Sequence, residues 1–79
     1  MVLTAPQKER SRFLGVLASY QATPNDQNAW AARVAAEGLG RLRDKPSVPT
    51  VLETIGPASK DLVLEQSLVR ALIDIEAAA

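Results

Sequence analysis

The chain has 79 residues, a formal net charge of zero, and neither cysteine nor histidine. Without these two residue types it forms no disulfide, no zinc site of the usual kinds and no nucleophile with an imidazole base, so we predict a protein that is not an enzyme and has no catalytic residue, metal or cofactor. A domain of this length buries only about 60% of the surface that its unfolded chain exposes, so contact with another chain would add substantially to its stability.

The apolar runs are those expected of a soluble, cytoplasmic protein that does not enter a membrane. Residues 13–22 follow a basic segment and superficially resemble the apolar part of a signal peptide. Polar residues interrupt this run, and it is too short to span a bilayer, so an amphipathic helix is the better interpretation. The excess of alanine, and of arginine over lysine, suggests a bacterial or phage origin.

Two start signals in the N-terminal half predict two long helices. Residues 4–7 have the form of a capping box, with a proline in the first turn, and predict a helix over 5–21. Residues 23–26 repeat the signal, with Thr23 as the expected N-cap, and predict a second helix that extends to about residue 43.

The second helix carries small residues beside larger apolar ones. Trp30 and Val34 lie along one border of its apolar face, and a trough of small residues lies next to them: Ala31, Ala35 and Gly38. We expect a neighbouring helix to pack into this trough, with a binding groove as the alternative, and we expect Trp30 to be a structural residue that is at least half buried. Gly38 and Gly40 each disfavour a helix by about 1 kcal/mol, so the helix could also end there.

The C-terminal half predicts a short helix followed by a long one. Thr50 and Glu53 form a capping box for a short helix over 51–56, which the Gly56-Pro57 pair ends. The last helix begins between residues 58 and 61 and continues to about 77. No strand pattern and no repeat appears, so residues 1–79 are expected to form one all-α domain, a small bundle of three longer helices and one short helix.

The last helix has more aliphatic side chains than one packed layer requires. An inner stripe is formed by Leu64, Leu68, Ala71, Leu72 and Ile75. A second stripe lies beyond two glutamates, and the two stripes together span about 200° of the helix. Either this helix is central in its own bundle, or the second stripe contacts another chain. We predict the second stripe and its glutamates as a partner interface, most simply between the subunits of a homodimer: Leu62, Glu65, Val69, Ile73 and Glu76.

Charge is distributed unevenly along the chain. Residues 1–45 hold seven Lys and Arg against four acidic residues, and residues 46–79 hold two against five, so the two parts carry +3 and −3. An antiparallel pairing of the first two helices would gather a candidate basic patch at one end of the molecule: Lys8, Arg10, Arg12, Arg41, Arg43 and Lys45.

These features favour a small, non-catalytic helical module for protein–protein interaction, such as an accessory subunit, a regulator or a phage-encoded inhibitor. Its protein partner is not identified by any motif. The alternative is a weak or regulatory nucleic-acid-binding protein that uses the basic patch. Residues 51–66 resemble a helix-turn-helix in outline, although Pro57 and Glu65 occupy positions that are normally apolar and Asp61 would repel phosphate.

Overall fold

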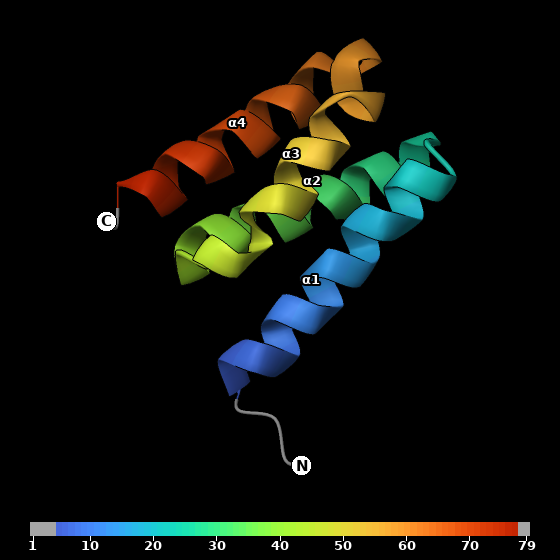
Figure 1. The fold of residues 1–79 in the computed structure, drawn as a ribbon. Coiled ribbons are helices and arrows are strands. Elements are labelled where there is room, and N and C mark those ends of the chain that lie inside the picture. Colours follow the sequence, from blue (N-terminus) through green and yellow to red (C-terminus); the bar gives the residue numbers. More distant parts are fainter. Residues whose placement is uncertain (1–4, 78–79) are drawn as a thin grey trace.

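The computed structural model describes residues 5–77, and these form four α-helices without a strand (Figure 1). The α-helices are α1 (Ala5–Ala22), α2 (Asp26–Leu42), α3 (Val48–Ile55) and α4 (Leu62–Glu76). Two short 3-10 helices, η1 (Lys45–Ser47) and η2 (Pro57–Lys60), lie before and after α3. The predicted all-α bundle of three longer helices and one short helix is therefore confirmed.

The start of α2 lies two residues beyond the predicted cap. Asn25 is the N-cap, because its Oδ1 accepts a hydrogen bond from the Asn28 amide at 2.8 Å. The Asn28 side chain donates to the Thr23 carbonyl, also at 2.8 Å, so Thr23 stabilises the preceding turn instead. Asparagine is a better N-cap than threonine, which explains the shift. The capping box predicted at residues 4–7 begins outside the described residues.

The end of α2 is fixed by a left-handed residue and not by its glycines. Arg43 has a φ of 52°, and its amide donates to the Gly40 carbonyl at 3.1 Å. The Asp44 amide donates to the Leu39 carbonyl at 3.4 Å, which completes a Schellman motif. The helix therefore continues through Gly38 and Gly40 and ends close to the predicted boundary.

The start of α3 was predicted too late. The helix begins at Val48, directly after η1, with Pro49 in its first turn, where the missing amide hydrogen costs nothing. Thr50 consequently lies inside the helix, and its carbonyl accepts a hydrogen bond from the Thr54 hydroxyl at 2.7 Å. The last helix, α4, begins at Leu62, one residue after the predicted range, because Asp61 is its N-cap.

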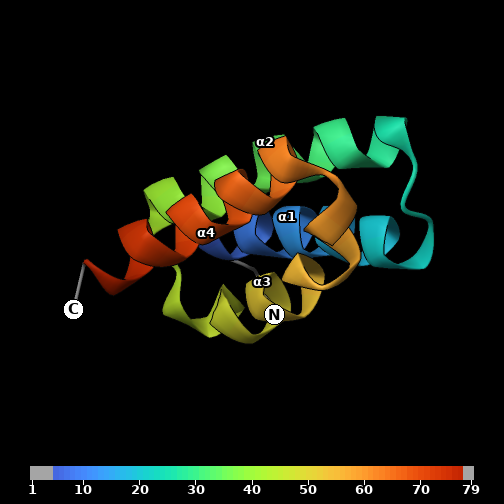
Figure 2. The same cartoon turned by 90° about the horizontal axis from the view of Figure 1, so that it is seen from above.

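The central helix of the bundle is α2. It packs against α1 on one side and α4 on the other, and α3 packs against both α1 and α4. Figure 1 shows α1 and α4 at opposite sides of the molecule, and Figure 2 shows α2 and α3 on opposite faces between them. The interpretation of α4 as the central helix is therefore wrong, because its main contacts are with α2 and α3.

Glycines allow α2 to approach both of its neighbours. A side chain at Gly38 would collide with the ring of Phe13 on α1. A Cβ at Gly40 would lie 3.3 Å from the Ala71 Cα on α4. The expectation that a neighbouring helix packs against the small residues of α2 is confirmed on the α1 side, where Ala35 and Gly38 are buried.

Trp30 is 63% exposed, so the prediction that it is at least half buried is wrong. The buried face of α2 is centred on Ala32, Ala36 and Leu39, and Trp30 lies on the opposite side of the helix, about 160° from Ala32. Alanines at the centre of this face bring the neighbouring helices close, which leaves no space for an indole ring. The large side chain therefore lies at the surface.

The inner stripe of α4 forms its part of the core, as predicted. Leu64, Leu68 and Ile75 are fully buried, and Ala71 is nearly so. Leu72 is partly buried against the same cluster.

Among the described residues, every helix is too short or too polar to span a bilayer.

Candidate docking surfaces

The second stripe of α4 is exposed along its length. Leu62 is 64% exposed, Val69 43% and Ile73 58%. The stripe lies on the side of α4 that faces away from the core, and neither α3 nor the 3-10 helices cover it. We call these three residues the α4 surface; they are the apolar members of the predicted partner interface.

Leu52 on α3 is a further exposed apolar side chain. Its side chain is 53% exposed. Thr54 faces α1, because its hydroxyl oxygen accepts a hydrogen bond from the Gln21 side chain at 2.8 Å. Leu52 is separated from Thr54 by about 160° around α3 and so lies on the side away from α1. The sequence pattern predicts Leu52 as one of the apolar anchors of the short helix, and its exposure shows that this is wrong.

The border of the α4 surface is acidic. Glu65 is half-buried and Glu76 is exposed, and neither forms an ion pair with any residue that the structure describes. Arg70, the nearest cation on the same helix, is bound to Asp74 by an ion pair of 3.4 Å between Nε and Oδ1. The uncompensated charge beside the three aliphatic side chains is therefore negative.

A second apolar surface lies between α1 and α2. A hollow of about 210 Å³ is lined almost entirely by apolar side chains: Phe13, Val16, Trp30, Ala31, Val34 and Ala35. We call these six residues the α1/α2 groove. Arg12 forms its edge, with its guanidinium carbon 5.2 Å from the centroid of the Phe13 ring. The groove is the binding alternative that the sequence analysis left open for the trough of α2.

The groove continues toward the C-terminal end of α2. An adjoining hollow of about 430 Å³ shares Phe13 and Val34 with the groove and extends to Leu42 and Arg41. Arg12 lines both hollows. Its ion pair with Glu9 spans 3.0 Å between exposed side chains, where such pairs contribute little.

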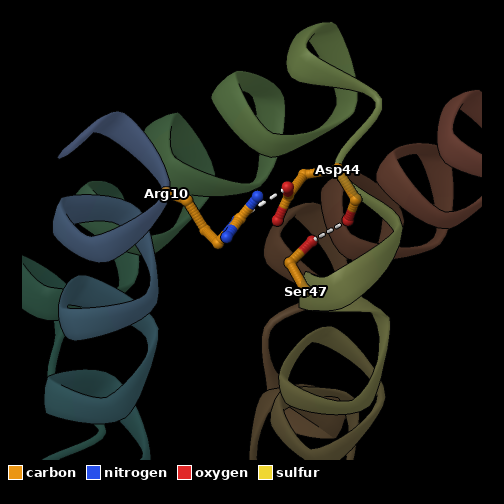
Figure 3. Close-up of polar contacts among 3 residues, drawn as sticks. All are labelled: Arg10, Asp44 and Ser47. Carbon is orange, nitrogen blue, oxygen red and sulfur yellow. Dashed lines mark hydrogen bonds and ion pairs between the residues drawn. The ribbon is translucent and has the colours of Figure 1, made fainter. Parts of the chain in front are cut away.

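The predicted basic patch exists only in part. The start of α1 does lie beside the end of α2, as the ion pair between Arg10 Nε and Asp44 Oδ1 at 2.7 Å shows (Figure 3). Asp44 is only 8% exposed and Arg10 33%, so Arg10 serves an internal contact and contributes little to an outer patch. The other members are exposed: Lys8, Arg12, Arg41, Arg43 and Lys45. Whether they bind nucleic acid stays a prediction.

Asp44 is held at the junction of three elements. Its carbonyl accepts a hydrogen bond from the Ser47 hydroxyl at 2.6 Å, and Ser47 is itself fully buried (Figure 3). The Oδ2 atom of Asp44 is buried and has no hydrogen-bond partner among the described residues. Arg10 is therefore the main compensation for the buried carboxylate.

Two features of the described residues bear on catalysis. Tyr20 is buried, and its hydroxyl donates to the Pro57 carbonyl at 3.4 Å. Burial raises the pKa of Tyr20 above its usual value of 10.0, and the charge of Asp61 raises it further, so this hydroxyl stays protonated at neutral pH. No group of three Asp or Glu side chains within residues 5–77 is arranged to hold a metal ion.

A hollow of about 600 Å³ lies between α2 and α4. Most of its lining residues are polar, and they include the Arg70–Asp74 ion pair, with Glu37 and Arg41 on the opposite side. These groups pair with one another or extend into solvent, so they do not converge on a common point.

Comparison with known proteins gave no relatives. The sequence matches no protein-family model, and neither the curated proteins nor the solved structures contain a match. The two apolar surfaces and their charges are therefore the features that bear on function.

Proposed function

We propose that this protein is a non-catalytic helical module that docks on another protein chain through the α4 surface, and that the simplest such chain is a second copy. The observation that supports this is the exposure of Leu62, Val69 and Ile73 on the side of α4 that faces away from its own core. Contiguous apolar patches on soluble proteins usually mark interaction sites.

The energetic argument concerns the small core. Much of the buried face of α2 is alanine, so the bundle gains less from burial than a core of larger side chains would provide. Complete burial of one aliphatic side chain stabilises a protein by about 1.5–3 kcal/mol. Burial of the three half-exposed side chains of the α4 surface would therefore add substantially to stability. Association with a second chain would bury these side chains and gain this free energy.

The test is a glutamate on the α4 surface. Val69→Glu places a charge where the proposal requires an apolar contact, while the side chain stays solvated in the isolated subunit. At micromolar concentration, light scattering is expected to report at least twice the 8.5 kDa chain mass for the wild type and a single chain mass for Val69→Glu.

Val63→Glu is the matched control. Val63 is also on α4 and is 51% exposed, compared with 43% for Val69, but it lies about 120° away around the helix. Val63→Glu should leave the mass from light scattering equal to that of the wild type. A wild type that stays monomeric, or an equal loss of association in both variants, would contradict the proposed role of the α4 surface.

A further inference from the structure

We infer that the α4 surface of one copy docks into the α1/α2 groove of another copy, so that the chain assembles head to tail. This inference rests on the proposed function and specifies which surface α4 meets. The alternative is a two-fold dimer in which α4 packs against α4. Three properties of the two surfaces favour the head-to-tail arrangement: shape, length and charge.

The shapes are complementary. The α4 surface is a single row of side chains on one helix and is therefore a ridge. The α1/α2 groove is a hollow between two helices, and Trp30 and Val34 form its outer wall on α2. Ridges pack best into grooves, whereas two ridges facing each other leave gaps on both sides.

The lengths also agree. At a rise of about 1.5 Å per residue, Leu62 and Ile73 are about 16 Å apart along α4. Trp30 and Leu42, which mark the two ends of the groove and its extension, are about 18 Å apart along α2. The groove with its extension is therefore long enough to accommodate the whole ridge.

Charge distinguishes the two arrangements most clearly. Glu65 and Glu76 border the ridge without ion-pair partners among the described residues. Arg12 at the edge of the groove is paired with Glu9, which lines the same hollow. Arg41 borders the extension of the groove and Arg43 is exposed just beyond it, and neither forms an ion pair with a described residue, so the uncompensated charge there is positive. Docking of ridge into groove brings opposite charges together, whereas a two-fold pairing of α4 places the acidic border against itself.

The single tryptophan provides a direct signal. Trp30 is the only tryptophan of the chain and is mostly exposed in the isolated subunit. Head-to-tail docking would cover it, so its fluorescence emission should shift to shorter wavelength as the protein concentration rises. In an α4 to α4 dimer Trp30 would keep its exposure, and its emission would not change.

A mixing experiment with two valine variants tests the inference. Val34→Glu blocks the groove but retains Trp30, and Val69→Glu blocks the ridge; the two side chains are 42% and 43% exposed. Each variant alone is expected to be monomeric. An equimolar mixture should form a complex of two chains and no larger, because its free ridge and its free groove both carry a glutamate. Wild-type protein, with both surfaces intact, should grow beyond two chains with concentration.

The outcomes separate the inference from the proposed function. If Val34→Glu alone still forms dimers, and Val69→Glu stays monomeric in the mixture, α4 pairs with α4. The head-to-tail inference is then overturned, and the proposed function stands. If the wild type is monomeric at all concentrations, self-association fails altogether. Salt gives a second readout, since raising NaCl from about 50 mM to about 500 mM should weaken head-to-tail assembly and strengthen pairing of two acidic ridges.

Discussion

Replacement of Leu68 by alanine should lower the free energy of unfolding by about 2–5 kcal/mol. Leu68 is fully buried in the cluster where α4 meets the rest of the bundle, so the change removes apolar burial and leaves a cavity. Small domains have total stabilities of about 5–15 kcal/mol, so a large part of the stability would be lost. Urea unfolding followed by circular dichroism measures the effect, at one low protein concentration so that association does not contribute.

Leu62→Ala is the control, because it makes the same chemical change on the same helix. Leu62 is mostly exposed, and its replacement should change the stability of the isolated subunit by no more than about 0.5 kcal/mol. Equal losses for the two variants would show that the outward stripe belongs to the core, and the docking proposal would then lose its basis.

Loss of the Arg10 charge should produce the second large decrease in the free energy of unfolding. Arg10→Met keeps the apolar part of the side chain but leaves the buried Asp44 carboxylate without its cation. We expect a loss of about 1–3 kcal/mol, below the value for a fully buried pair, because Arg10 is one-third exposed and water can partly replace it. The same urea titration provides the measurement.

Two further variants isolate the role of this ion pair. Arg12→Met removes an exposed arginine whose ion pair with Glu9 should contribute about 0–1 kcal/mol. Asp44→Asn combined with Arg10→Met should recover part of the loss, because the amide carries no charge to bury. If Arg10→Met costs no more than Arg12→Met, Asp44 is compensated by something other than Arg10.

The periodicity of α4 allowed both of its stripes to be predicted from the sequence. Glu65 and Glu76 divide the aliphatic residues into an inner set and an outer set. This division depends only on positions around α4 and not on how the other helices are arranged. Which apolar side chains of the other helices stay exposed could not be predicted in this way. Leu52 depends on how α3 rotates on the bundle, and this rotation is set by contacts far apart in the sequence.

The orientation of α2 was harder to predict because alanine is compatible with either side of a helix. The spacing of Trp30 and Val34 predicts an apolar border, whereas the face of α2 that is buried is the one with Ala32, Ala36 and Leu39. Aromatic size favours burial only when the neighbouring helices leave enough space, and closely packed alanines remove it. The same error made the α1/α2 groove only the alternative interpretation of the trough, since a buried tryptophan would have filled it.

Long-range polar pairing was also beyond the sequence patterns. Arg10 was assigned to a basic patch because of its neighbours along the chain, and its partner Asp44 is 34 residues away. The antiparallel pairing of the first two helices was correct, and it is this pairing that brings the two side chains together.

The most direct test of the account is the chemical accessibility of the outer face of α4 as the protein concentration rises. The chain has no cysteine, so Ile73→Cys introduces a single thiol on the α4 surface, and Ala18→Cys introduces one on an exposed part of α1 as the control. Each variant, at trace amount, is labelled with a thiol reagent in wild-type protein at about 1 µM and at about 200 µM, a range that spans micromolar affinities. Docking through the α4 surface predicts labelling at residue 73 that is several-fold slower at the higher concentration, with no change at residue 18. An equal labelling rate at residue 73 in both conditions would contradict it.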